Sequence, residues 1–162
     1  MAKAKVSKKL QQAIDSLVIN DVYLKSAQAE CVDNFDPKSA DSLEALSVQQ
    51  MHIVRKSEVI QVDGDGQLVR IYIRLGARWV SQQEEGDEPD IQALIEGEFI
   101  AEYLVTNPLE QEAIDEYALK NASYHVWPYW REFLSSQCER LRLPRVVLPT
   151  VQFSKQPDPT AD

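Results

Sequence analysis

Apolar and polar residues alternate most regularly over residues 67–79 of this chain. One side of the pattern collects Val69, Ile71, Ile73, Leu75, Ala77 and Trp79, and the other collects Arg70, Tyr72, Arg74 and Arg78. A period of two residues is typical of a β-strand that buries one face and exposes the other to water. We therefore predict a half-buried strand here.

Three further stretches have β-strand character, namely residues 18–32, 46–62 and 91–105. The first loses its alternation near Asn20 and Asp21, as a β-bulge would cause. The last places Ile95, Phe99, Ala101 and Tyr103 on one face, and Leu94, Glu96, Glu98, Ile100 and Glu102 on the other. The sequence Asp63-Gly64-Asp65-Gly66 is suited to a tight hairpin. Short connections between successive strands favour an antiparallel meander, and the Asp-, Pro- and Ser-rich stretch after the first strand is expected to be a loop.

Apolar residues at helical spacing predict helices at both ends of the strand region. Leu10, Ile14 and Leu17 predict a short N-terminal helix within residues 6–17. Asn107 as N-cap, Pro108 in the first helical position and Glu110 predict a helix that continues to about residue 120. A second C-terminal helix should begin just before Pro128, because proline is tolerated in a first turn. Its apolar face is expected to contain Val126, Trp127, Trp130, Phe133, Leu134, Cys138 and Leu141.

The residue pattern thus predicts four antiparallel strands followed by two C-terminal helices. We divide the chain into a basic arm with a short helix at 1–16, a single domain at 17–153 and a disordered tail at 154–162. A chain of 162 residues is long enough for one domain with a substantial core.

The net charge of −9 disfavours nucleic acid and anionic membranes as partners and favours basic ones. The basic start of the chain is not followed by the apolar segment of a signal peptide, and no run approaches the length of a membrane-spanning helix. Cys31 and Cys138 lie far apart and have no nearby partner cysteine, so we expect reduced thiols. Together these features predict a cytoplasmic protein.

The histidines, cysteines and glutamates of the chain could in principle form a catalytic site or a metal site. His125, Cys138 and a nearby glutamate could be combined into a nucleophile, a base and an orienting acid. Cys138 falls on the apolar helix face, however, and free cysteine there behaves as a small hydrophobe. His52, His125 and the cysteines also lack metal-ligand spacing. We therefore expect no enzyme, no metal and no cofactor.

The outward faces of the third and fourth predicted strands have opposite charges. Arg70, Arg74 and Arg78 face Glu96, Glu98 and Glu102 on a strand that should lie alongside. Cross-strand ion pairs would explain this arrangement, and so would a charged surface that docks a partner. The charge pattern alone does not separate the two interpretations.

A dispersed pattern in the C-terminal third consists of Asn121, Pro128, Tyr129, Arg131 and Glu132, followed by Arg140, Pro144, Leu148, Pro149, Val151 and Phe153. This pattern resembles the SecB family of bacterial export chaperones. The resemblance implies an α+β fold, a four-stranded antiparallel sheet with a crossover loop, backed by two C-terminal helices. The resemblance implies ATP-independent chaperones, assembled as dimers of dimers, that hold unfolded preproteins in apolar grooves and deliver them to the motor SecA. By position it implies a client groove near Phe35, Trp127 and Trp130. It also implies a docking site for SecA at Glu30, Leu94 and Glu96.

Three departures from the family pattern bear on SecA. Ser26 stands where the family usually has an acidic residue, arginines on the third strand would partly neutralise the docking face, and the chain ends nine residues after Phe153. Our hypothesis is therefore an oligomeric holdase for unfolded preproteins, with SecA as a further candidate partner. A SecB-like chaperone of other clients, such as an antitoxin, and a non-catalytic adaptor module are the alternatives.

Overall fold

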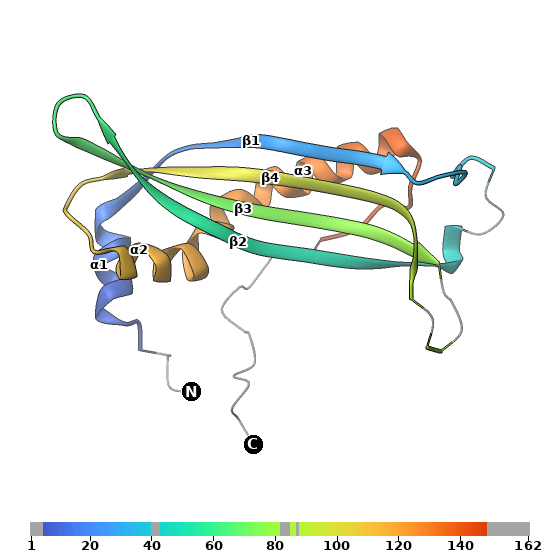
Figure 1. Cartoon of the computed structure of the whole chain (residues 1–162), viewed down its shortest axis with the longest axis horizontal. Coiled ribbons are helices and arrows are strands. Elements are labelled where there is room, and N and C mark those ends of the chain that lie inside the picture. Colours follow the sequence, from blue (N-terminus) through green and yellow to red (C-terminus); the bar gives the residue numbers. More distant parts are fainter. Residues whose placement is uncertain (1–4, 40–42, 82–84, 87, 149–162) are drawn as a thin grey trace, which may run out of the picture.

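The computed structural model describes residues 5–39, 43–81, 85–86 and 88–148 and has an α+β fold (Figure 1). The helical elements are α1 (Lys8–Ser16), the 3-10 turn η1 (Leu43–Ala45), α2 (Gln111–Tyr117), the π-helix η2 (Ala118–Ala122) and α3 (Ser123–Leu141). The strands are β1 (Leu17–Cys31), β2 (Leu46–Val62), β3 (Gly66–Ser81) and β4 (Asp90–Val105). The predicted fold class is therefore confirmed. Pro149, Val151, Phe153 and the predicted tail lie outside the described residues.

The four strands form one antiparallel sheet in the order β1-β4-β3-β2. Strands β2, β3 and β4 are the meander part, and β1 pairs with β4 at the opposite edge from β2 (Figure 1). The chain thus crosses the sheet between β1 and β2, where the crossover loop was predicted. As a result, the first and last predicted strands are neighbours and their outward side chains share one surface.

Three register irregularities lie in the edge strands on either side of the central pair, two in β1 and one in β2. In β1 the register shifts between Ile19 and Asp21, as predicted, and again between Leu24 and Ser26. In β2 it shifts between Val54 and Lys56. A β-bulge inserts one extra residue into a strand, which changes the direction of the side chain there and bends the strand. The two shifts not foreseen from the sequence re-aim Lys25 and Arg55.

The helix start predicted at Asn107 is wrong. Helix α2 begins at Gln111 with Glu110 as N-cap, and no side chain caps it. The backbone N–H and the hydroxyl of Thr106 both donate to the carbonyl oxygen of Ser16, at 2.8 and 3.1 Å. This tertiary tether holds the chain after β4 against the end of α1, so the local capping signals at Asn107 and Pro108 are not used.

The start predicted for the last helix is also wrong, because Pro128 lies inside α3 rather than at its first turn. Helix α3 begins at Ser123, and the π-helix η2 leads directly into it from α2 with helical backbone angles at Ala118 and Ala122. Pro128 lacks the N–H that would bond to the carbonyl oxygen of Tyr124. The helix continues nevertheless, since its burial against the sheet outweighs one missing hydrogen bond.

The core lies between the inner face of the sheet and the helices. On β3 and β4 the inward residues of the predicted pattern, from Val69 to Trp79 and from Ile95 to Tyr103, are almost fully buried. Helix α3 contributes a buried stripe of Val126, Trp130, Leu134 and Cys138. Leu10 and Ala13 of α1 join the same core. No helix in the described part of the chain is both long and apolar enough to cross a membrane.

Candidate functional site

Helix α3 covers only part of the inner face of the sheet. It packs mainly on β4, β1 and β3, whereas the helical element that β2 contacts most is η2. On the inner face of β2, Val48 and Val59 are 38% and 39% exposed, and Gln50 and His52 are also exposed. We call Val48, Gln50, His52, Val54 and Val59 the uncovered strip. It is an open surface of valines with two polar side chains among them, rather than a closed cavity.

A hydrogen bond between the side chains of His52 and Ser123 ties the uncovered strip to the start of α3. The Nε2 atom of His52 lies 2.6 Å from the Oγ atom of Ser123, which is itself buried. Partial burial lowers the pKa of His52, because desolvation disfavours the imidazolium form. The bond therefore joins a neutral imidazole to a buried hydroxyl.

A second histidine ties the same part of α3 to the centre of the sheet. The hydroxyl of Tyr103 on β4 lies 2.8 Å from the Nδ1 atom of His125, and the ring of Tyr117 packs edge-on against Tyr103 with centroids 5.2 Å apart. Burial lowers the pKa of His125 and strongly raises that of Tyr103. His125 thus links the start of α3 to the central strand β4 through this hydrogen bond.

The aromatic residues of α3 divide into a core group and an exposed group. Trp130 is 2% exposed and meets the ring of Phe99 edge-on at 6.5 Å, so it belongs to the core and does not line a surface groove in this structure. Trp127 is half-buried and packs against the core from the flank of the helix. Tyr124 and Tyr129 are 41% and 48% exposed. The helical spacing had placed Trp127 and Trp130 on the apolar face and Tyr124 and Tyr129 off it, but it did not show that Trp130 is enclosed while Trp127 is only half-buried.

Phe35 lies apart from the helix aromatics. It packs against the edge of the core and lines an open hollow of about 430 Å³ at one end of the sheet, together with Val32 and Ile91. Three acidic residues, Asp33, Asp36 and Asp90, also line it. Trp127 and Trp130 do not line this hollow, so the three residues predicted for the client groove are not brought into one pocket.

The three residues predicted for partner docking do lie together on the outer face. Glu30 is paired with Leu94 across β1 and β4, and Glu96 is the next outward residue on β4. Glu30 accepts a hydrogen bond of 2.8 Å from the Nε2 atom of Gln28. Glu96 forms an ion pair with Arg74. The charge of Glu96 is therefore partly neutralised within the sheet.

Ion pairs extend over much of the outer face, which confirms the cross-strand interpretation for two of the arginines. Arg70 pairs with Glu102 at 2.7 Å and Arg74 with Glu96, whereas Arg78 donates to Gln49. The hydrogen bonds from Arg70 and, to a lesser degree, Asn20 hold the pKa of Glu102 below its usual range. The outer face is thus a network of paired charges around the ring of Tyr72 and the side chain of Ile100, both of which are nearly buried.

The edge strands contribute two cations that the strand pattern did not predict. Lys25 and Arg55, placed by the bulges in β1 and β2, approach Glu98 from opposite edges at 3.6 and 3.2 Å. Glu98 is almost buried, so it gains a partner from each side. The apolar–polar alternation of β1 is lost at Lys25, and this was the only sign of the bulge in the sequence of this strand. Most neighbouring residues are polar, so the spacing of apolar residues could not locate the one-residue shift.

Both cysteines are at least partly shielded from solvent. Cys138 is 2% exposed and Cys31 is half-buried, and burial raises the pKa of both thiols. In the part of the chain that the structure describes, no group of three or more His, Cys, Asp or Glu side chains could hold a metal ion.

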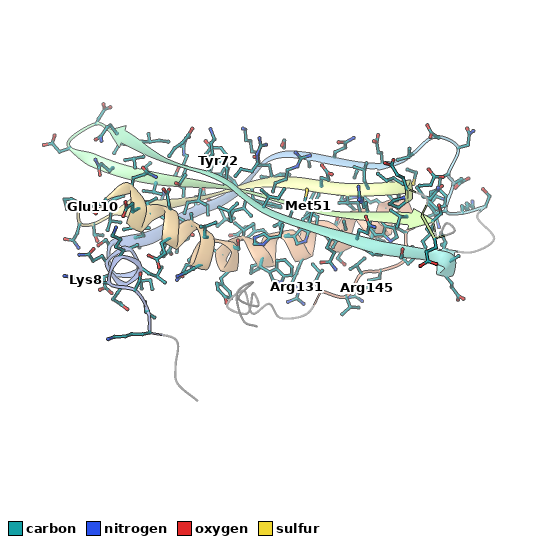
Figure 2. All side chains as sticks on the ribbon, turned by 60° about the horizontal axis from the view of Figure 1, so that its bottom comes forward. Lys8, Met51, Tyr72, Glu110, Arg131 and Arg145 are labelled. Carbon is teal, nitrogen blue, oxygen red and sulfur yellow. The ribbon has the colours of Figure 1, made fainter. Side chains whose placement is uncertain are left out.

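A further hollow of about 250 Å³ lies between α3 and residues 145–148, with Arg131 and Arg145 beside it, on the helical side of the sheet (Figure 2).

Comparison with known proteins gives a structural likeness alone. No family model matches this sequence, and no curated protein matches it at a significant level. Among solved structures, the chain is similar to the SecB-like chaperone Rv1957 of Mycobacterium tuberculosis, solved in complex with a ChAD peptide from the Rv1956 HigA1 antitoxin. The TM-score is 0.68 at 18% sequence identity, over 90% of this chain and 98% of the other. This protein therefore has a SecB-like fold.

Proposed function

We propose that this protein is an ATP-independent chaperone that holds extended, unfolded segments of client proteins against the inner face of its sheet. The observation that carries the proposal is the uncovered strip on β2, where Val48 and Val59 remain exposed and His52 is bonded to the start of α3. A folded protein gains by covering such a surface, at roughly 25 cal/mol per Å² of apolar area. The SecB-like chaperone of similar fold was solved in complex with a peptide from an antitoxin, and this supports the proposal that the present chain also binds a segment of a client protein.

The shape of the strip suits an extended chain better than a compact ligand. The strip follows one edge strand from Val48 to Val59, and the polar side chains of Gln50 and His52 lie between its valines Val48 and Val54. An extended client offers side chains at the same spacing and can contact several sites weakly. Affinity then comes from many contacts rather than from one deep pocket, which permits clients of varied sequence.

Two client classes follow from this role. Unfolded preproteins would be handed to SecA through the docking site at Glu30, Leu94 and Glu96. An antitoxin or another dedicated client would require no such transfer. The pairing of Glu96 with Arg74 and of Glu98 with Lys25 and Arg55 favours the second class, because these cations would have to be displaced by a basic motor segment.

We further propose that the protein acts in the cytoplasm as a homo-oligomer, arranged as a dimer of dimers, without catalysis or cofactor. Strand β1 supports an assembly, since it is an edge strand with Ile19 and Leu24 exposed on its inner side and Val18 on its outer side. A long apolar edge is usually covered by another chain or by protective charges. The size of the assembly can be measured by light scattering on the purified protein.

The test of the chaperone role is the aggregation of a denatured model client, such as citrate synthase, diluted into buffer without nucleotide. We expect light scattering to fall as the protein is added, and added ATP to have no effect. Unchanged scattering at a molar excess of the protein would refute the proposal. Capture of one folded partner from a lysate, without unfolded ones, would support the adaptor alternative instead.

A further inference from the structure

The outer face of the sheet contains one row of side chains that is entirely apolar. Strand pairing aligns Ile60 with Leu68, Leu68 with Leu104, and Leu104 with Val18, so the row crosses all four strands. We call these four residues the outer apolar row. Val18 and Leu104 are 48% and 44% exposed, and Val62 beside Ile60 is 40% exposed. The remaining rows of this face each contain at least one charged or polar side chain.

The row lies away from both surfaces discussed above. It crosses the end of the sheet that has the β2–β3 hairpin, while Glu30 and Leu94 lie at the other end (Figure 1). Helices α1 and α2 are packed beneath the opposite face, where Ser57 donates a 2.8 Å hydrogen bond to Asp115. The row therefore faces solvent and belongs neither to the uncovered strip nor to the predicted docking site.

Acidic side chains border the row on two sides. The next row consists of Asp21, Glu102, Arg70 and Glu58, with Lys56 bound to Glu58. On the other side, Asp63 and Asp65 occupy the hairpin turn directly after Val62. Five carboxylates thus surround the row with two cations, Arg70 and Lys56, among them. A partner that covers the row must also match this negative border.

We infer that the outer apolar row is a second interaction surface, which binds a partner segment with an apolar stripe flanked by basic side chains. The apolar stripe would cover Val18, Leu104 and Leu68. Lysine or arginine side chains on either side would then lie within reach of Asp21 and Asp63. This surface goes beyond the proposed client site, because it is on the other face of the sheet and selects a partner by charge.

The probe for this surface is a fluorescently labelled amphipathic peptide of leucine and lysine, with a leucine and glutamate peptide of the same pattern as its counterpart. We expect the basic peptide to bind the full-length protein more weakly at high salt, and the acidic peptide not to bind. Leu104→Lys should reduce the affinity at least about tenfold. Ile53→Lys is the matched control, since Ile53 is 47% exposed on the same face and outside the row. It should reduce the affinity less than about twofold.

Other outcomes would overturn the inference. Equal binding of both peptides, or an equal loss of binding in both variants with unchanged circular dichroism, would show that the row does not select a basic partner. A wild-type oligomer that dissociates only in Leu104→Lys would assign the row to a second copy of this chain. Suppression of client aggregation should remain in Leu104→Lys, so failure of this inference and failure of the chaperone proposal can be told apart.

Discussion

The Nε2 atom of His52 on β2 lies 2.6 Å from the Oγ atom of Ser123, the first residue of α3. This bond connects the edge strand that α3 leaves uncovered to the start of that helix. His125, two residues further on, is bound to Tyr103 on β4. The start of α3 is therefore held to the sheet at two points, and each point contains an imidazole with a lowered pKa.

The stability of the fold should decrease as the pH falls below about 6.5, the ordinary pKa of histidine. Both histidines have a lower pKa in the folded protein. Above about pH 6.5 they are neutral in both the folded and the unfolded state, so they do not change the free energy of unfolding with pH. Below it, the unfolded chain binds protons first and is favoured. Urea unfolding at about pH 7.5 and about pH 5.5 measures the difference. The double variant His52→Gln/His125→Gln should have a smaller difference, and an unchanged one would contradict this origin.

Substitutions of the adjacent residues Trp130 and Tyr129 should have very different effects on the free energy of unfolding. Trp130→Ala removes a fully buried ring that contacts Phe99, and we expect a loss of about 3–5 kcal/mol in the free energy of unfolding. Tyr129→Ala removes a half-exposed ring and should cost less than about 0.5 kcal/mol. Denaturant unfolding compares the two variants. Similar losses in both would show that the assignment of core and surface aromatics is incorrect.

Arg70 should contribute more to stability than Arg78, although both are outward residues of β3. Glu102 is 8% exposed, and Arg70→Met leaves this carboxylate with the amide of Asn20 as its hydrogen-bond donor among the described residues. We expect a loss of about 1–3 kcal/mol. Arg78→Met removes a bond to the exposed Gln49 and should change stability by less than about 0.5 kcal/mol.

The effect of Arg70→Met should also depend on pH. The folded-state pKa of Glu102 is lowered by Arg70, so the stabilisation is present above the ordinary glutamate pKa of about 4.3 and is lost as the pH falls through the folded value. Thermal unfolding of wild type and variant between about pH 7 and pH 3 should therefore converge at the acid end. A constant difference between the two would exclude the ion pair as its cause.

The uncovered strip should be needed for client holding. Val48→Asp places a charge on the inner face of β2, and we expect about tenfold more protein to be required for half-suppression of client aggregation. Ile53→Asp makes the same change on the outer face of the same strand and should leave the suppression unchanged. If both variants behave alike, the client does not distinguish the two faces of β2.

The alternation of residue types was sufficient to predict four strands and the faces of β3 and β4. In these strands, burial on one side and solvent on the other impose a strict period of two, and Val69 to Trp79 follow it without interruption. The outward charges Arg70 and Glu102 could be anticipated as neighbours for the same reason. Edge strands were less informative, because Lys25 and Arg55 are exposed and a bulge there changes no apolar position.

Helix boundaries were decided by contacts distant in sequence. Asn107, Pro108 and Glu110 form a good local start signal, but Thr106 is bound to Ser16 and the helix begins later, at Gln111. Pro128 is a local signal for a helix start, yet α3 is already formed when the chain reaches it, since η2 continues directly from α2. Local preferences of about 1 kcal/mol are smaller than the packing energy of a buried helix.

By itself, the sequence determined the fold class, the buried faces of the central strands and the aromatic, apolar character of α3. It could not determine which aromatics of α3 remain accessible, because Trp127 and Trp130 have the same chemistry and differ only in their position relative to the sheet. Only the tertiary structure decided that Trp130 is enclosed, that Val48 and Val59 stay uncovered, and that Val18 and Leu104 align in one row. Exposure depends on how far one element extends over another, and no single segment contains that information.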